Sequence, residues 1–306
     1  MHLLRRSMLA IADQPRVERT IRGRGITERL VKRFVAGETL DDALTVVCRL
    51  ADQGMTATLD QLGENVTTAD EARAAVSVYT DMLERLAANQ LQPNISIKLT
   101  MLGLSIDDEL AKENVLPILS AARAVGGFVR IDMEGSAYTE RTLRLFAAFH
   151  DQYPEQVGIV IQSYLHRARA DVEAMIARRA RVRLVKGAYA EPETVAFQNN
   201  AEIDLNYRWL MELLLERGNY PAIATHDPIL IQATKETARR LGRGQDQFEF
   251  QMLYGVRRDE QTALTREGYR MRIYVPFGTQ WYPYFTRRIA ERPANALFVL
   301  RQLVSG

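Results

Sequence analysis

The feature that most constrains the fold of this chain is a regular alternation of short β-type runs with longer amphipathic stretches. The β-type runs span residues 56–59, 95–99, 128–133, 158–164, 181–185, 222–225, 248–252 and 272–275. The stretches between them carry apolar residues at helical spacing and are long enough for helices that cross back over a sheet. Such repetition predicts an α/β protein, a parallel (β/α)8 barrel of the TIM type with extra N-terminal helices.

Two units are expected along the 306 residues. Residues 1–50 are predicted to form helices that pack on the barrel, and residues 51–306 are predicted to form the barrel itself. No low-complexity stretch or linker marks a further domain. Ser105 and Thr139 are expected to cap the helices that follow them, because each precedes an apolar stretch of helical spacing.

Composition restricts the class of partner. Basic and acidic residues number 40 and 38, a net charge of +2, which is too even to suggest nucleic acid as a partner. No apolar run is long enough to span a bilayer, and no signal peptide is recognisable. The single cysteine, Cys48, falls inside an apolar helical pattern, which predicts a core position and a reducing, cytoplasmic compartment.

The N-terminal segment is locally basic. Residues 1–36 hold nine basic residues against three acidic ones. This excess favours attraction to an anionic membrane surface, which would place the protein peripherally on the inner face of a membrane. Solvated helices that flank a barrel explain the same charges, so the sequence leaves both interpretations open.

Polar residues interrupt several β-type runs near their ends. Along residues 94–99, Ser96 and Lys98 share the face opposite to the apolar side chains, so Lys98 is expected to point inward. In a barrel of this kind, the carboxyl ends of the strands and the loops after them form the active site. The residues expected to converge there are Lys98, Asp132, Gln162, Arg183, Lys186, Thr225 and His226.

Each of these residues also has another interpretation. Lys98 could extend its ammonium group to solvent at the barrel edge, and Asp132 could cap a helix or pair with Arg130. Lys186 has the position of a Schiff-base lysine in barrel aldolases. His226 is a potential metal ligand, but no other histidine has a spacing with it that suggests a metal site, so no metal is expected.

A further cluster of charge lies near the C-terminus. Arg287 and Arg288 are adjacent, and Tyr284 and Glu291 lie three or four residues from them, so on a helix all four occupy neighbouring surface. Guanidinium groups bind carboxylates through two parallel hydrogen bonds. The segment is therefore a candidate anion site, with a solvated helix surface held by internal ion pairs as the alternative.

Seven motifs carry a resemblance to a known family. They are SIKL at 96–99, RIDME at 130–134, IQSYL at 161–165, RLVKGAY at 183–189, ATH at 224–226, EFQMLYG at 249–255 and YFTRRIAE at 284–291. In this order they resemble proline dehydrogenase over residues 55–293. The resemblance implies that the barrel oxidises L-proline to Δ1-pyrroline-5-carboxylate by hydride transfer to FAD, with electrons passed on to a quinone.

The resemblance also implies roles for individual residues. Asp132 and Arg183 match the catalytic pair of the family, and Lys98, Arg287 and Arg288 match the residues that bind the substrate carboxylate. A fixed cation beside the flavin stabilises the negative charge that develops on it. The residues that match the enclosure of the proline ring are Leu184, Tyr189, Leu253, Tyr274 and Tyr284. Those that match the FAD site are Met133, Gln162, Lys186, Gly187, Ala188, Thr225 and His226.

Three positions extend or depart from this pattern. Glu64 matches a residue that pairs with Arg288 as a gate over the bound substrate. Ala190 stands where bifunctional members carry tryptophan, which resembles the monofunctional branch, so a separate pyrroline-5-carboxylate dehydrogenase is expected to act on the product. Asp227 stands where asparagine is common and places a negative charge near the expected cofactor phosphates.

Two other functions are compatible with parts of the pattern. A Schiff-base aldolase would use Lys186, need no flavin, and be trapped by borohydride together with its carbonyl substrate. A membrane-surface or regulatory barrel would use the basic N-terminus. Neither function explains all seven motifs.

Overall fold

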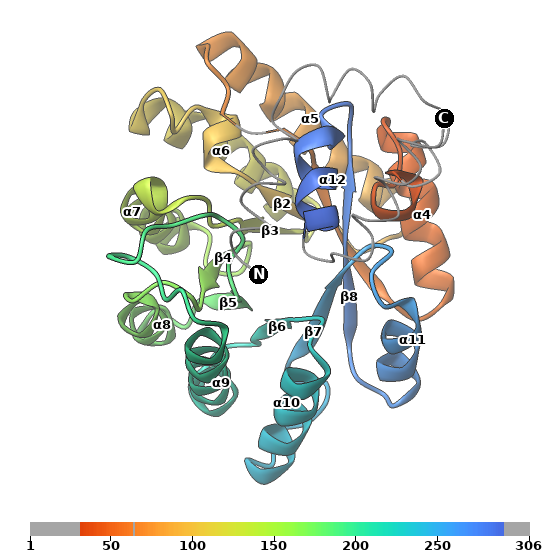
Figure 1. Ribbon diagram of the computed structural model, residues 1–306. Helices are drawn as coiled ribbons and strands as arrows, with labels where there is room; N and C mark the ends of the chain where they lie inside the picture. The colour runs from red at the N-terminus through yellow and green to blue at the C-terminus, as the bar shows by residue number, and fades with distance from the viewer. Residues whose placement is uncertain (1–30, 64, 291–306) are drawn as a thin grey trace, which may run out of the picture.

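The computed structural model describes residues 31–63 and 65–290 and contains a closed barrel of parallel strands (Figure 1). The strands follow one another around the barrel in chain order: β1 (Thr56–Gln61), β2 (Asn94–Ile97), β3 (Phe128–Ile131), β4 (Val157–Gln162), β5 (Arg181–Val185), β6 (Ala222–Ala224), β7 (Glu249–Leu253) and β8 (Met271–Phe277). The barrel closes where β8 pairs with β1, from Thr56 opposite Arg272 to Gln61 opposite Phe277. The predicted (β/α)8 fold is confirmed.

A helix follows each strand. These helices are α5 (Ala69–Ala88), α6 (Asp108–Ala124), α7 (Ser136–Gln152), α8 (Ala168–Ala177), α9 (Asn200–Arg217), α10 (Pro228–Arg240), α11 (Arg258–Arg266) and α12 (Trp281–Ala290), and a short 3₁₀ turn, η1 (Leu99–Leu102), precedes α6. A further helix, α4 (Leu40–Asp52), comes before β1 and packs against β1 and β8. Residues 1–30 of the predicted N-terminal unit lie outside the described residues. Within the described part of the chain, no helix is long and apolar enough to cross a membrane.

The starts of two helices differ from those predicted. α6 begins at Asp108 because the side chain of Asp107 accepts hydrogen bonds from two backbone N–H groups of the first turn. Ser105, the predicted cap, instead donates its hydroxyl to the carbonyl oxygen of Val66 at 3.0 Å. Thr139 lies buried inside α7, which starts one turn earlier. Both caps were therefore placed wrongly, while the helices themselves were predicted.

The cysteine also lies elsewhere than predicted. The buried side chains of α4 are Leu40, Ala43, Leu44, Val46, Val47 and Leu50. Cys48 is exposed, and it lies two turns after the exposed Asp41 on the same side of the helix. The prediction of a core cysteine is wrong because position 48 lies on the exposed side of α4, outside the row of buried residues.

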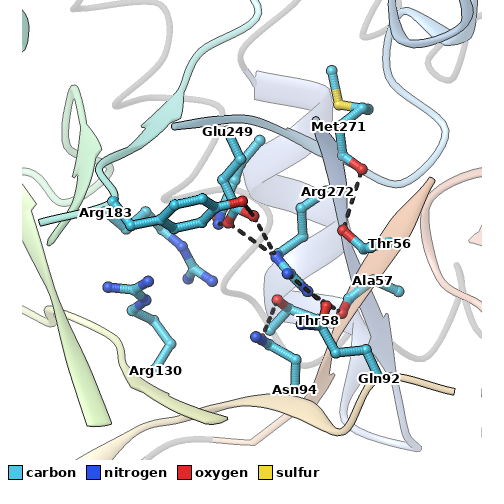
Figure 2. Close-up of polar contacts among 12 residues, drawn as sticks. Thr56, Ala57, Thr58, Gln92, Asn94, Arg130, Arg183, Glu249, Met271 and Arg272 are labelled. Carbon is cyan, nitrogen blue, oxygen red and sulfur yellow. Dashed lines mark hydrogen bonds and ion pairs between the residues drawn. The ribbon is translucent and has the colours of Figure 1, made fainter. Parts of the chain in front are cut away.

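A polar cluster fills part of the barrel interior (Figure 2). Arg272 on β8 donates from Nε to the two carboxylate oxygens of Glu249 on β7, at 2.9 and 3.1 Å. Its Nη1 donates to the carbonyl oxygen of Ala57 and its Nη2 to the side chain of Gln92. Both members of the ion pair are almost fully buried, so these contacts replace the water that the charges lose.

A second buried arginine crosses the same interior. Arg130 on β3 donates from Nη1 to the carbonyl oxygens of Ile159 and Arg181, which joins β3 to β4 and β5. Gly158 on β4 lies beside this guanidinium, and a Cβ added there would come within 2.7 Å of the Arg181 carbonyl oxygen. The missing side chain at Gly158 therefore provides the space through which Arg130 passes.

Candidate active site

A cavity of about 490 Å³ opens at the carboxyl ends of the strands. Every strand contributes to its wall at or near its end, and α12 contributes Tyr284. The predicted residues that line the cavity are Lys98, Asp132, Met133, Gln162, Arg183, Lys186, Gly187, Ala188, Tyr189, Thr225, His226, Leu253, Tyr274 and Tyr284. The barrel thus brings together side chains that are far apart in the sequence, at the end of the fold where active sites of this architecture lie.

Some of the predicted site residues are not placed in this cavity. Glu64 lies outside the described residues, and so do the side chains of Arg287 and Arg288, whose backbone belongs to α12. Leu184 is fully buried and does not line the cavity. Since side chains alternate along a strand and Arg183 points inward, Leu184 points toward the surrounding helices.

Asp132 is the centre of the hydrogen-bond network on the cavity floor. Its Oδ1 accepts a hydrogen bond from Arg183 Nη1 at 2.8 Å, and its Oδ2 accepts one from the Tyr274 hydroxyl at 2.8 Å. Lys98 Nζ lies 3.8 Å from the same Oδ2. Burial, together with the charges of Asp132 and Asp60, raises the pKa of Tyr274 well above its ordinary value, so its phenol stays protonated and acts as a donor. The alternative pairing of Asp132 with Arg130 is not seen.

Asp60 is a cavity residue that the sequence did not indicate. It lies at the end of β1, its side chain is 1% exposed, and its Oδ1 accepts a hydrogen bond from Lys98 Nζ at 2.7 Å. Burial alone would lower the pKa of Lys98, but attraction to Asp60 and Asp132 outweighs burial, so the pKa lies above its ordinary value and the amine stays charged. The β-type run was ended at residue 59; extended by one residue, it places Thr58 and Asp60 on the inward face.

Arg183 has more hydrogen-bond donors than the described residues accept. Its Nη1 donates to Ser96 Oγ at 3.1 Å as well as to Asp132, and its guanidinium lies 5.3 Å from the ring centre of Tyr274. Its Nε and Nη2 are buried and have no hydrogen-bond partner among the described residues. Buried guanidinium donors are costly to leave unsatisfied, so an acceptor is expected beside these two groups.

Lys186 is held between two carboxylates. Its Nζ lies 2.5 Å from Oδ1 of Asp204 on α9 and 3.0 Å from Oδ2 of Asp227. Burial opposes the charge, but the hydrogen bonds to both carboxylates raise the pKa of Lys186 above its ordinary value. Asp227 also caps α10, because its Oδ1 accepts a hydrogen bond from the backbone of Ile229. Asp227 therefore pairs with Lys186 and also starts α10.

Three further cavity residues are fixed by backbone contacts. Gln162 Nε2 donates to the carbonyl oxygen of Glu134 at 2.9 Å, and Thr225 Oγ1 accepts a hydrogen bond from the backbone of Asp227. His226 Nε2 accepts a hydrogen bond from the backbone N–H of Leu253 at 2.9 Å, which occupies the lone pair that a metal would need. The part of the chain that the structure describes contains no group of three or more side chains that could hold a metal ion.

Gly187 is required by its backbone and by a neighbour. Its φ is +123°, and a Cβ added there would overlap the ring of Tyr164. We expect Gly187→Ala to lower the free energy of unfolding by about 2–4 kcal/mol, because it combines a strained φ with a steric overlap. Urea denaturation followed by circular dichroism measures the loss.

The matched control is Gly242→Ala. Gly242 also has a positive φ, +66°, but a Cβ added there would meet no atom within 4 Å. Its expected cost is about 1 kcal/mol, the cost of the backbone conformation alone. Equal losses in the two variants would contradict the role given to the Tyr164 ring.

Comparison with known proteins places the chain in one family. The model of a family described as proline dehydrogenase matches residues 43–301. Proline dehydrogenase 1 of Bacillus subtilis subsp. natto is 44% identical over 273 residues, which cover 89% of this chain and 90% of that protein. Proline dehydrogenase of Deinococcus radiodurans is 40% identical over 308 residues, which cover 99% of both chains.

Solved structures agree with this relationship. Proline utilization A (PutA) of Bdellovibrio bacteriovorus, in a crystal structure of the protein inactivated by N-propargylglycine, superposes with a TM-score of 0.82 at 30% identity. The match covers 87% of this chain and 33% of that one, so the chain spans about a third of the length of that PutA. The family model and the extended identity to curated relatives lead to one conclusion: the chain belongs to the proline dehydrogenase family, oxidoreductases that act on proline in its catabolism.

Proposed function

We propose that this chain oxidises L-proline to Δ1-pyrroline-5-carboxylate with FAD as the hydride acceptor and passes the electrons on to a quinone. The observation that carries the proposal is the floor of the cavity, where Asp132, Arg183, Tyr274 and Lys98 form one connected network. Two of the donors in this network, Nε and Nη2 of Arg183, still need an acceptor.

The residues around the cavity fit a flavin. The spare donors of Arg183 suit the acceptor atoms of a flavin ring, and a cavity of about 490 Å³ lies within the roughly 300–1,000 Å³ range of cofactor sites. The residues proposed to line FAD are Met133, Gln162, Lys186, Gly187, Ala188, Thr225 and His226. When bound, FAD supplies an acceptor for two electrons and a proton as hydride.

The substrate is proposed to be held by its carboxylate and its ring. Lys98, which carries a charge in the buried network, would bind the carboxylate together with Arg287 and Arg288 of α12. The walls of the ring site would be Tyr189, Leu253, Tyr274 and Tyr284. These side chains would exclude water from the ring carbon that is bonded to nitrogen and carries no carboxylate. This carbon loses a hydride and the nitrogen loses a proton, so the C–N bond becomes C=N.

Asp132 and Arg183 are the proposed catalytic pair. The Arg183 cation would stabilise negative charge that develops at the acceptor, and Asp132 fixes that cation through its 2.8 Å hydrogen bond. Tyr274 donates to the other oxygen of Asp132, so the carboxylate is held from two sides. This arrangement needs no movement of the pair during the reaction, which is the condition under which electrostatic stabilisation is largest.

The aldolase alternative is less well supported by the chemistry of Lys186. A Schiff base forms from a neutral amine, whereas the contacts with Asp204 and Asp227 stabilise the ammonium form of Lys186. Lys186 is retained in the proposal as a residue that lines the cofactor.

Further partners belong to the same proposal. The electron acceptor would be a quinone reached at a membrane surface, with the protein otherwise cytoplasmic, and a separate pyrroline-5-carboxylate dehydrogenase would consume the product. Glu64 and Arg288 would form the gate over the substrate. The predicted division into residues 1–50 and 51–306 is retained as part of this proposal.

The proposal is tested by identifying the bound cofactor and the reaction product. Heat release of the bound cofactor followed by chromatography against FAD and FMN standards should identify FAD. Incubation with L-proline and an artificial dye acceptor should yield a compound lighter than proline by the mass of two hydrogen atoms. A different cofactor, or turnover without this product, would contradict the proposal.

A further inference from the structure

A buried carboxylate, that of Asp60, lies beside the residues that are proposed to bind the substrate. Asp60 lines the cavity from the end of β1 and is 1% exposed, whereas the side chains of Lys98 and Asp132 are 11% and 15% exposed. Asp60 therefore lies deeper than the two groups that it accompanies. A carboxylate this deep is retained at a cost in desolvation that its contacts must offset.

Lys98 lies between two carboxylates at unequal distances. Its Nζ is 2.7 Å from Asp60 Oδ1, which is a charge-assisted hydrogen bond, and 3.8 Å from Asp132 Oδ2, which is beyond hydrogen-bond length. Asp132 already accepts from Arg183 and Tyr274. The ammonium group therefore lies closer to Asp60 than to a carboxylate that has other donors.

Two carboxyl groups, those of Asp60 and Asp132, face two basic groups, those of Lys98 and Arg183. Burial raises the pKa of Asp60, and attraction to the Lys98 ammonium opposes that rise. Without the charge of Asp60, Asp132 would be the nearest carboxylate to Lys98, and the ammonium would move toward it. That movement would change the position of the Lys98 ammonium relative to the substrate carboxylate that it is proposed to bind.

We propose that Asp60 is a positioning residue for proline oxidation, which holds the Lys98 ammonium in place for the substrate carboxylate and leaves Asp132 to Arg183 and Tyr274. The inference rests on the proposed role of Lys98 in carboxylate binding. It adds a residue from β1, a strand to which the proposal so far assigns none. Asp60 acts through Lys98 and does not itself touch the substrate.

The experiment compares Asp60→Asn, Lys98→Met and the double variant with the wild-type holoenzyme, using L-proline and an artificial dye acceptor. Asp60→Asn keeps the shape and removes the charge, so KM for proline should rise about tenfold or more while kcat changes less than about threefold. Lys98→Met should raise KM at least as much. The double variant should match Lys98→Met, because Asp60 has nothing to position once the ammonium is gone.

The matched control is Asp171→Asn. Asp171 is a buried aspartate in α8 that pairs with Arg167 at 2.8 Å, and it does not line the cavity. The KM of the Asp171→Asn variant for proline should equal that of the wild type. Thermal melting establishes that each variant is folded, and if Asp60→Asn is not, Asp60→Ser replaces it with the same expected rise in KM.

The outcomes separate this inference from the proposed role of Lys98. If Lys98→Met raises KM but Asp60→Asn leaves it unchanged, Asp60 is not a positioning residue and the role of Lys98 stands. If the losses of the two single variants add in the double variant, Asp60 acts independently of Lys98 and the inference is overturned. If Lys98→Met leaves KM unchanged, carboxylate binding by Lys98 and the inference both fail.

Discussion

Replacing Arg183 with methionine is expected to lower kcat/KM for proline by about 10²–10³-fold, the usual loss when one preorganised electrostatic group is removed from an active site. Arg183 is buried, donates to Asp132 and Ser96, and has two further donors directed to no described residue. Methionine keeps much of the side-chain volume and removes all of these donors. Steady-state kinetics with an artificial dye acceptor measure the effect.

The control for this variant lies on the same strand. Arg181→Met changes the arginine at the start of β5, where Arg181 packs on aromatic rings and lies 3.7 Å from Glu155. Because Arg181 does not line the cavity, its kcat/KM should stay within about twofold of the wild type, as expected for a residue that does not contact the reacting groups. Equal losses in both variants would attribute the effect to the strand and not to the cavity.

Replacing Arg272 with methionine is expected to destabilise the barrel by about 3–5 kcal/mol, because it leaves the Glu249 carboxylate buried without its partner. The pair is 7% and 4% exposed, so solvent screens it little, and Arg272 also bonds Ala57 and Gln92. Urea denaturation measures the change. The surface pair of Arg240 with Glu212 is more than half exposed, so Arg240→Met should cost less than about 1 kcal/mol.

The Arg272 prediction has a defined dependence on pH. Burial alone would raise the pKa of Glu249, but Arg272 and the hydrogen bonds outweigh it, so the pKa lies below its ordinary value of 4.5. In the wild type this group therefore contributes stability above pH 4.5, which is lost as the pH falls through the folded pKa. In Arg272→Met, burial is no longer offset by the charge of Arg272, so the pKa of Glu249 rises. The stability difference between the two proteins should be largest at neutral pH and shrink in acid; a difference independent of pH would contradict this account.

The sequence predicted the barrel because strand and helix periods are local signals. Alternation within residues 94–99 also predicted that Lys98 points inward, and Arg183 was expected beside it at the strand ends, where both residues line the cavity. Helix starts were less predictable. Asp107 and Ser105 are both suitable caps, and the choice between them depends on Val66, a residue distant in sequence to which Ser105 donates.

Contacts between strands were the part that the sequence could not show. Asp60 lies one residue beyond the predicted end of its strand, and its importance comes from Lys98, which is 38 residues away. Likewise, Asp227 was expected near cofactor phosphates, but its pairing with Lys186 depends on how β5 and β6 lie side by side. Such partners depend on the register of neighbouring strands, which no short pattern encodes.

The measurement that tests the central proposal most directly is the visible spectrum of the purified protein, recorded anaerobically before and after addition of L-proline and, separately, of D-proline. The account predicts flavin absorption bands that L-proline bleaches and D-proline leaves unchanged, because the cofactor, the reaction and the enclosed substrate site are then all present. A colourless protein that does not bind added FAD, or flavin bands that L-proline does not change, would contradict it.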